Sequence, residues 1–221
     1  MEIFEGLHGF LWQSMTENNC NTYLIDGSKR ILVDPGHLDL FGHVKEGLKE
    51  LGLERTDIDL VICTHAHPDH LEAAGLFQET SAQLTYHEAD WAMVKTMMAH
   101  HGAAFQMSVD AVRPDFFLSE GDLYVGDMNF QVFHTPGHAP GAICIYQPEG
   151  RVLFTGDLVF KDGLGRTDLP GGDGRLLKES IRRVAGLDVN WVLPGHGEII
   201  SGRDEVKRNF QQIESFWFAH I

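Results

Sequence analysis

The chain has 221 residues, of which 43% are hydrophobic and 22% charged, and its formal net charge is −15 with histidine neutral. This length can bury a sizeable core, and we expect one domain over residues 1–221. We expect neither a membrane nor a nucleic acid as a partner, because no stretch is long and apolar enough to span a bilayer and no basic run is present to bind phosphates.

The N-terminus and the cysteines bear on the cellular compartment. The first residues, Met1 to Glu5, lack the basic and apolar regions of a secretory signal. Cys63 and Cys144 lie inside apolar, strand-like patterns and are expected to be buried free thiols, and nothing gives Cys20 the neighbours of a nucleophile. The three cysteines therefore fit a reducing compartment, and we predict a cytoplasmic protein.

The first third of the chain predicts strands that alternate with a helix. Residues 21–25 and 30–33 are apolar runs on either side of a turn and are predicted to form a hairpin. A helix is expected over 41–51, where apolar residues recur at helical spacing. A further strand begins at Leu60. This alternation favours an α/β fold.

Directly behind that strand, the chain concentrates side chains that bind metals. Within six positions lie His65, His67, Asp69 and His70. Imidazole and carboxylate suit zinc, iron and related divalent metals. Pro68 prevents the strand from continuing, and a turn directs successive side chains around one point instead of to opposite faces. The pattern predicts a metal site. Asp69 is also expected to cap a helix from His70 to Gly75, as it would in an ordinary histidine-rich surface turn.

Residues 87–112 are predicted to be helical, with large apolar side chains at Trp91, Val94, Met97, Met98 and Phe105. Methionines and aromatics at such spacing usually pack in a core or against another subunit, so a homo-oligomer is left open. The alternative is that this segment forms the wall of a pocket and shapes the choice of substrate.

One local pattern then recurs three times: a short apolar run, turn-forming residues, and a side chain able to bind metal. The three side chains are His138, Asp157 and His196. Strands fix the position of such ligands, while glycine permits the backbone to bend between them. We expect four strand ends to converge on one edge of a sheet and to bring all these side chains together.

These residues resemble the signature of the metallo-β-lactamase-fold hydrolases, which is His-x-His-x-Asp-His followed by His, Asp and His at later strand ends. The resemblance extends from about residue 21 to His196. Residues 154–157 and 165–173 look like the glyoxalase II and persulfide dioxygenase branch, in a short form without the glutathione-binding C-terminal extension. The resemblance implies a four-layer αββα sandwich.

The resemblance also implies two divalent metal ions per chain, with zinc expected and iron or manganese left open. It implies one site of His65, His67 and His138, a second site of Asp69, His70 and His196, and Asp157 as a bridge between them. Asp34 would support the metal loop, unless it is simply a turn residue. Arg166 would organise a mouth loop over 161–174, unless it forms only a structural ion pair.

The implied activity is hydrolysis of a small-molecule thioester, as in hydroxyacylglutathione hydrolase, or of a related ester. Hydroxide held between two metals would attack the carbonyl, and Asp69 would orient it. The main alternative is a mononuclear iron persulfide dioxygenase that uses His65, His138 and Asp157 as a two-histidine, one-carboxylate triad. A lactonase-type hydrolase and a non-catalytic metal-binding protein are further alternatives.

Overall fold

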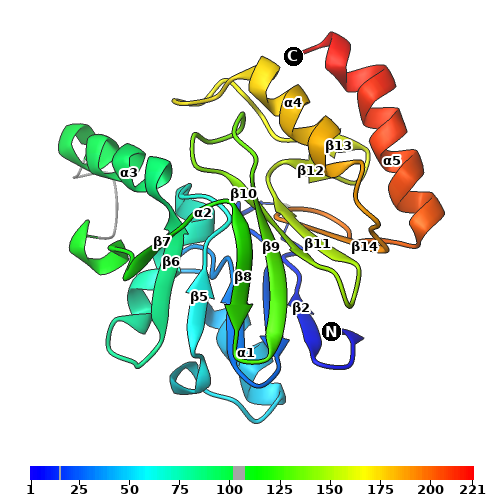
Figure 1. Cartoon of the computed structure of the whole chain (residues 1–221). Helices are drawn as coiled ribbons and strands as arrows, with labels where there is room; N and C mark the ends of the chain where they lie inside the picture. The colour runs from blue at the N-terminus through cyan, green and yellow to red at the C-terminus, as the bar shows by residue number, and fades with distance from the viewer. Residues whose placement is uncertain (15, 102–107) are drawn as a thin grey trace.

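The computed structural model of the chain describes residues 1–14, 16–101 and 108–221. Two β-sheets lie at its centre, with α1 (Gly42–Glu50) and α3 (Glu88–His101) toward one side and α4 (Gly174–Val184) and α5 (Arg203–Phe216) toward the other (Figure 1). None of the described helices is long and apolar enough to cross a membrane.

The first sheet has seven strands in the spatial order β1-β2-β3-β4-β5-β6-β7. Its strands are β1 (Glu2–Phe4), β2 (Leu7–Phe10), β3 (Thr22–Asp26), β4 (Arg30–Val33), β5 (Leu60–Ile62), β6 (Gln83–His87) and β7 (Phe116–Leu118). Neighbours pair antiparallel from β1 to β4 and parallel from β4 to β7. The predicted hairpin is confirmed as β3 and β4, and the strand predicted from Leu60 is confirmed as β5.

The second sheet has six strands in the spatial order β15-β14-β11-β10-β9-β8. Its strands are β8 (Gly121–Val125), β9 (Met128–His134), β10 (Ile143–Gln147), β11 (Val152–Gly156), β14 (Trp191–Pro194) and β15 (Ile200–Ser201). Because β10 is antiparallel to both β9 and β11, and β14 is parallel to β11, the strands β9, β11 and β14 end at one edge. A separate small ribbon consists of β12 (Val159–Phe160) and β13 (Gly163–Leu164).

Alternation of side chains along the central strands builds the layers. In β4, Leu32 joins an apolar cluster with Val44 of α1, whereas Ile31 and Val33 join a cluster between the sheets that includes Phe154 of β11. A third cluster packs the second sheet against α4 and α5. Helices therefore cover the outer face of each sheet, and the predicted four-layer αββα sandwich is confirmed.

The predicted helices are found with changed limits. The helix expected over 41–51 is α1, and the helical segment expected over 87–112 contains α3 followed by the 3-10 turn η4 (Asp110–Val112). Residues 102–107, and Phe105 with them, lie outside the described residues. The other 3-10 turns are η1 (Arg55–Asp57), η2 (Glu72–Phe77) and η5 (Trp217–Ala219).

The prediction that Asp69 caps a helix from His70 to Gly75 is wrong. The short helix α2 (Pro68–Leu71) begins at Pro68 and has His67 at its N-cap. Proline suits the first helical position because its missing N–H would have no partner there. Asp69 consequently lies in the first turn, and its carboxylate is available to other groups.

Candidate metal centre

The seven predicted metal-binding side chains lie together where strands of both sheets end. Four follow β5 of the first sheet, and three follow β9, β11 and β14 of the second. The expectation that all would converge on the edge of a single sheet is therefore wrong. Backbone hydrogen bonds join the two sheets beside the cluster: Ile143 N donates to Thr64 O at 2.8 Å, and Asn21 N donates to Gly195 O at 2.6 Å.

The ligand-type atoms of these residues form three groups whose members lie within 4.8 Å of one another. The groups are His65, His67 and His138; Asp69, His70 and His196; and His65, His70 and Asp157. The first two have the composition of the two sites implied by the resemblance. Asp157 Oδ2 lies 3.5 Å from His138 Nε2 and 3.4 Å from His196 Nε2, and Asp157 Oδ1 lies 3.3 Å from His70 Nε2. Assignment of these residues as metal ligands remains our prediction.

Buried atoms without partners indicate what the cluster is suited to hold. Among the described residues, His65 Nε2, His70 Nε2 and Asp157 Oδ1 are buried and have no partner in hydrogen-bonding geometry. A buried polar atom that lacks a partner costs about 1–3 kcal/mol. Imidazole nitrogens and carboxylate oxygens directed at one point satisfy a divalent cation. The cluster is therefore compatible with a divalent metal site.

The three histidines of the first group are in the protonation state that binds metals. Burial lowers the pKa of His65 well below its ordinary value and lowers the pKa of His67 to about 4. Burial also lowers the pKa of His138, although Asp157 opposes that shift. Near pH 7 these imidazoles are neutral, as a metal ligand must be.

The other two histidines balance the charge of the carboxylates. Burial by itself would lower the pKa of His196, but Asp157 and Asp69 outweigh burial and raise the pKa to about 9. Burial would also lower the pKa of His70, but the charges of Asp34 and Asp157 outweigh burial and raise that pKa. Burial would raise the pKa of Asp157, whereas the charges of His70 and His196, whose Nε2 atoms lie 3.3 and 3.4 Å from its oxygens, hold it well below its ordinary value. A bound divalent cation would displace the protons of these histidines.

The cluster lines a cavity of about 550 Å³. The residues around it come from the metal loops, from α3 and from the loop that follows Asp157, and they are Asn18, His67, Pro68, Asp69, Met97, His138, Asp157, Phe160, Leu164, Arg166, Leu169, Pro170 and His196. On α3, Val94 is buried in the core and Met97 lines the cavity. The segment predicted over residues 87–112 therefore has both of the roles that we considered: it packs in the core and forms one wall of the cavity.

A model of the metallo-beta-lactamase superfamily matches residues 15–196 of this chain. The chain belongs to the metallo-β-lactamase superfamily. One relative is a probable metallo-hydrolase, MJ0888, of Methanocaldococcus jannaschii, which is 35% identical over 81% of this chain and 88% of that protein. Another is the hydroxyacylglutathione hydrolase GloC of Haemophilus influenzae, which is 30% identical over 87% of this chain and 92% of that protein.

Two solved structures are similar to this chain over most of their length. TTHA1623 in a di-iron-bound form is 32% identical and superposes with a TM-score of 0.70 over 86% of this chain and 93% of that one. ETHE1 from Myxococcus xanthus is 26% identical and superposes with a TM-score of 0.66 over 96% of this chain and 90% of that one. The fold predicted from the residues is thus the fold of this superfamily.

Within this metallo-β-lactamase fold, Asp34 contacts the metal loop directly. Asp34 is buried and has a φ of +54°, a left-handed conformation that is uncommon for residues other than glycine. Its carboxylate accepts hydrogen bonds from the backbone N–H and the hydroxyl of Thr64, both at 2.7 Å, and lies 3.0 Å from His70 Nδ1. Asp34 thereby orients the His70 imidazole, with Nε2 directed at the cluster.

Replacing Asp34 by asparagine is expected to weaken zinc binding by about 10–100-fold, since groups that orient metal ligands contribute that much. Competition with a chelator of known affinity measures the change. The matched control is Asp59→Asn, because Asp59 also accepts a backbone N–H at 2.9 Å, from Arg30 at the opposite end of β4. Equal zinc affinity in Asp34→Asn and the wild type would contradict the supporting role.

The Arg166 side chain forms the ion pair that we considered as its alternative role. Its guanidinium donates to Asp168 at 2.7 and 2.6 Å, and both side chains are largely exposed. The backbone carbonyl of Arg166 accepts a hydrogen bond from His138 Nδ1 at 2.8 Å. That bond fixes the tautomer of His138 and leaves Nε2 to face the cluster. The mouth loop is therefore joined to the centre through a backbone atom.

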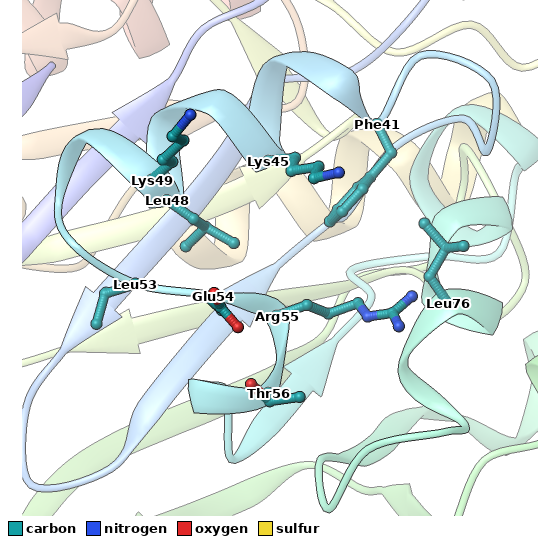
Figure 2. Close-up of a pocket in the computed structure, with 9 residues that line it drawn as sticks. All are labelled: Phe41, Lys45, Leu48, Lys49, Leu53, Glu54, Arg55, Thr56 and Leu76. Atoms are coloured by element: carbon teal, nitrogen blue, oxygen red, sulfur yellow. The ribbon is translucent and has the colours of Figure 1, made fainter.

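A second cavity, of about 530 Å³, lies beside α1 and η2 (Figure 2). Apolar side chains of α1 and η2 and the charged side chains of Lys45, Lys49, Glu54 and Arg55 line it. None of the residues that line it belongs to the three ligand-type groups found in the described chain. The chemistry of this superfamily member is accordingly assigned to the first cavity.

Two residues that contact the metal loops were missed from the sequence. Asn18 donates a hydrogen bond from Nδ2 to Asp69 Oδ2 at 2.7 Å. Asp90 accepts hydrogen bonds from the backbone N–H groups of Ala66 and Gly141. Asn18 is 51 positions from Asp69, and Asp90 is 24 positions from Ala66 and 51 from Gly141. No pattern within a short segment of the sequence could predict contacts over such separations. Asp90 resembles any acidic residue in the first turn of a helix.

Proposed function

We propose that the chain is a metal-dependent hydrolase that cleaves a small-molecule thioester, or a related ester. The observation that carries the proposal is the cluster of seven histidine and aspartate side chains, five of which line the 550 Å³ cavity. Membership of the superfamily and the similarity to a hydroxyacylglutathione hydrolase support the reaction class.

We propose that His65, His67 and His138 hold one divalent ion and that Asp69, His70 and His196 hold a second, with Asp157 shared. Zinc is expected, and iron or manganese would suit the same ligands. Similarity to TTHA1623, which was solved in a di-iron-bound form, supports two ions per chain. Divalent ions at such a site lower the pKa of water toward neutrality and polarise a carbonyl oxygen.

Asp69 is the proposed catalytic carboxylate. Burial would raise its pKa, but a hydrogen bond from His196 and the charge of His70 hold the pKa below its ordinary value, so the carboxylate is ionised. Asn18 and His196 restrain it from two sides, at 2.7 and 3.4 Å from Oδ2. An ionised carboxylate restrained in this way accepts a hydrogen bond from the attacking water and orients it toward the substrate.

The lining of the cavity favours a thioester. Among the described residues that line it, Arg166 is the one titratable side chain outside the cluster, and it is paired with Asp168. The cavity thus offers no separate acid to protonate a leaving group. A thiolate leaves without one, because the pKa of a thiol, about 8.5, is far below that of an alcohol.

Metal analysis of protein from unsupplemented cells, run beside an assay of S-lactoylglutathione hydrolysis, tests the proposal. We expect about two divalent ions per chain and turnover that a chelator abolishes and zinc restores. Protein that contains two ions per chain yet hydrolyses neither S-lactoylglutathione nor simple thioesters and esters would refute the proposed function.

The second candidate is an iron persulfide dioxygenase. His138 Nε2 lies 3.5 Å from the Asp157 carboxylate, and His65 belongs to a group with each of them, which supports a two-histidine, one-carboxylate triad of these residues. The structural similarity to ETHE1 also supports this candidate. One iron per chain, with oxygen uptake on glutathione persulfide and no thioester cleavage, would decide in its favour.

We propose a cytoplasmic location for a protein of one domain over residues 1–221. Cys20, Cys63 and Cys144 are buried and unpaired, and burial raises the pKa of each thiol. Such thiols remain stable in a reducing compartment. Fractionation of cells that express the tagged protein at its native level tests the location.

A further inference from the structure

The carboxylate of Asp90, in the first turn of α3, is fully buried. Its Oδ2 accepts a hydrogen bond from Ala66 N at 2.7 Å, and its Oδ1 accepts one from Gly141 N at 2.5 Å. No lysine or arginine forms an ion pair with it within the described part of the chain. Burying a carboxylate is costly, and its two hydrogen bonds, together with the charge of His134, offset part of that cost.

The two N–H groups belong to two different metal loops. Ala66 stands between His65 and His67 in the loop that follows β5 of the first sheet. Gly141 lies three positions after His138, in the connection from β9 to β10 of the second sheet. A single carboxylate thus holds together the two loops that supply the first histidine group. Across that junction, His67 Nδ1 lies 2.9 Å from His138 Nε2.

Gly141 and Asp90 are in close contact, with no room for a side chain at position 141. A Cβ atom at Gly141 would lie 2.6 Å from Asp90 N and 2.8 Å from its carboxylate, which is closer than real Cβ atoms come. Glycine is therefore required for the loop to approach the start of α3 this closely. Metal–ligand distances vary by only about 0.2 Å, so a small change in the spacing of the loops alters the affinity of the site.

We propose that Asp90 is a positioning residue of the metal centre, whose carboxylate sets the spacing between the His65–His67 loop and the His138 loop. Asp90 touches none of the ligand side chains and acts through the backbone of both loops. The same helix α3 carries Met97, which lines the cavity, so the wall of the pocket and the spacing of the histidines are linked. This inference rests on the proposed metal site and does not depend on the identity of the substrate.

The test is Asp90→Asn, which keeps the size of the side chain but replaces one acceptor oxygen by an N–H donor facing a backbone N–H. Zinc affinity, measured at 25 °C by competition with a chelator, is expected to fall about 10–100-fold. In the thioesterase assay kcat is expected to fall while KM changes little, since Asp90 does not line the cavity.

The matched control is Leu48→Ala. Leu48 is 1% exposed, lies on α1 and packs in the apolar cluster between α1 and the first sheet, where its aliphatic side chain forms no hydrogen bond or ion pair. Removing a buried leucine lowers the free energy of unfolding by about 2–5 kcal/mol, at least as much as the loss of a hydrogen bond. Leu48→Ala is expected to keep wild-type zinc affinity at 25 °C, which separates positioning of the metal centre from general stability.

Gly141→Ala provides a second variant, because its Cβ pushes the same contact apart from the other side. Wild-type zinc affinity in folded Asp90→Asn would overturn the inference, as would an equal loss of affinity in Leu48→Ala. Failure of both Asp90→Asn and Gly141→Ala to fold, with Leu48→Ala folded, would assign Asp90 a purely structural role. A wild-type protein that binds no zinc would refute the metal site itself, and that outcome is distinct from these.

Discussion

Replacing Asp157 by alanine is expected to remove the bound metal and to lower thioesterase kcat/KM by at least about a thousandfold. The Asp157 carboxylate lies within 3.5 Å of nitrogens from His70, His138 and His196, so its loss leaves both halves of the cluster short of a ligand. Metal ions contribute several kcal/mol of transition-state stabilisation, and each 1.4 kcal/mol or so is a factor of ten in rate. Elemental analysis and steady-state kinetics measure the two effects.

His138→Ala is expected to behave in the same way, because its Nε2 contacts both His67 and Asp157. Asp204→Ala and His220→Ala are the matched controls, since both residues are exposed and neither belongs to the cluster. The controls are expected to retain wild-type metal content and activity. Stoichiometric metal and full turnover in Asp157→Ala and His138→Ala would refute the ligand assignment.

Gly165→Ala is the second change with a large expected effect. A Cβ atom at this position would lie 1.8 Å from the carbonyl oxygen of Asp157 and 3.1 Å from His138 Nδ1. This carbonyl belongs to the backbone and cannot rotate away as a side chain could, so either the mouth loop or the backbone at Asp157 must shift. Such overpacking costs about 1–3 kcal/mol, and a loss of 2 kcal/mol would lower Tm by roughly 4–8 °C in a chain of this size.

The shift also acts on the centre, because the bond from His138 Nδ1 to the Arg166 carbonyl lies one residue away. Zinc content in Gly165→Ala is expected to fall below that of the wild type. Gly163→Ala is the matched control within the same loop, since its Cβ would meet nothing closer than 3.9 Å. Calorimetry and elemental analysis of the pair check the prediction, and indistinguishable variants would contradict it.

Local order in the sequence was enough to predict the strands that carry the candidate ligands. The residues 60–70 contain an apolar run followed by four candidate ligands, and the structure places β5 and the metal loop there. The same pattern of an apolar run followed by turn-forming residues predicted the positions of His138, Asp157 and His196, which follow β9, β11 and β14. The strands were predicted correctly because strand propensity and turn residues are properties of short segments, while the role of these side chains as metal ligands stays a prediction.

Local reasoning was wrong about Asp69 as a helix cap and about the edge on which the candidate ligands meet. Helix α2 starts at Pro68 because proline needs no partner at the first helical position. The ligand loops come from two sheets because β5 packs face to face with β9, β11 and β14 instead of pairing with them. Pairing partners are set by contacts between distant segments, which the order of residues along one segment does not encode.

The sequence by itself determined which side chains are candidates for the centre, since histidine and aspartate are compatible with a divalent cation in any fold that brings them together. Only the tertiary structure decided their spacing and orientation. Asp34, Asp90 and Asn18 reach the metal loops across 24 to 51 positions of chain, and the carbonyl of Arg166 orients His138 across 28. Contacts of this kind exist only after two sheets and α3 have packed, because packing is what brings a buried donor and its acceptor within 3 Å.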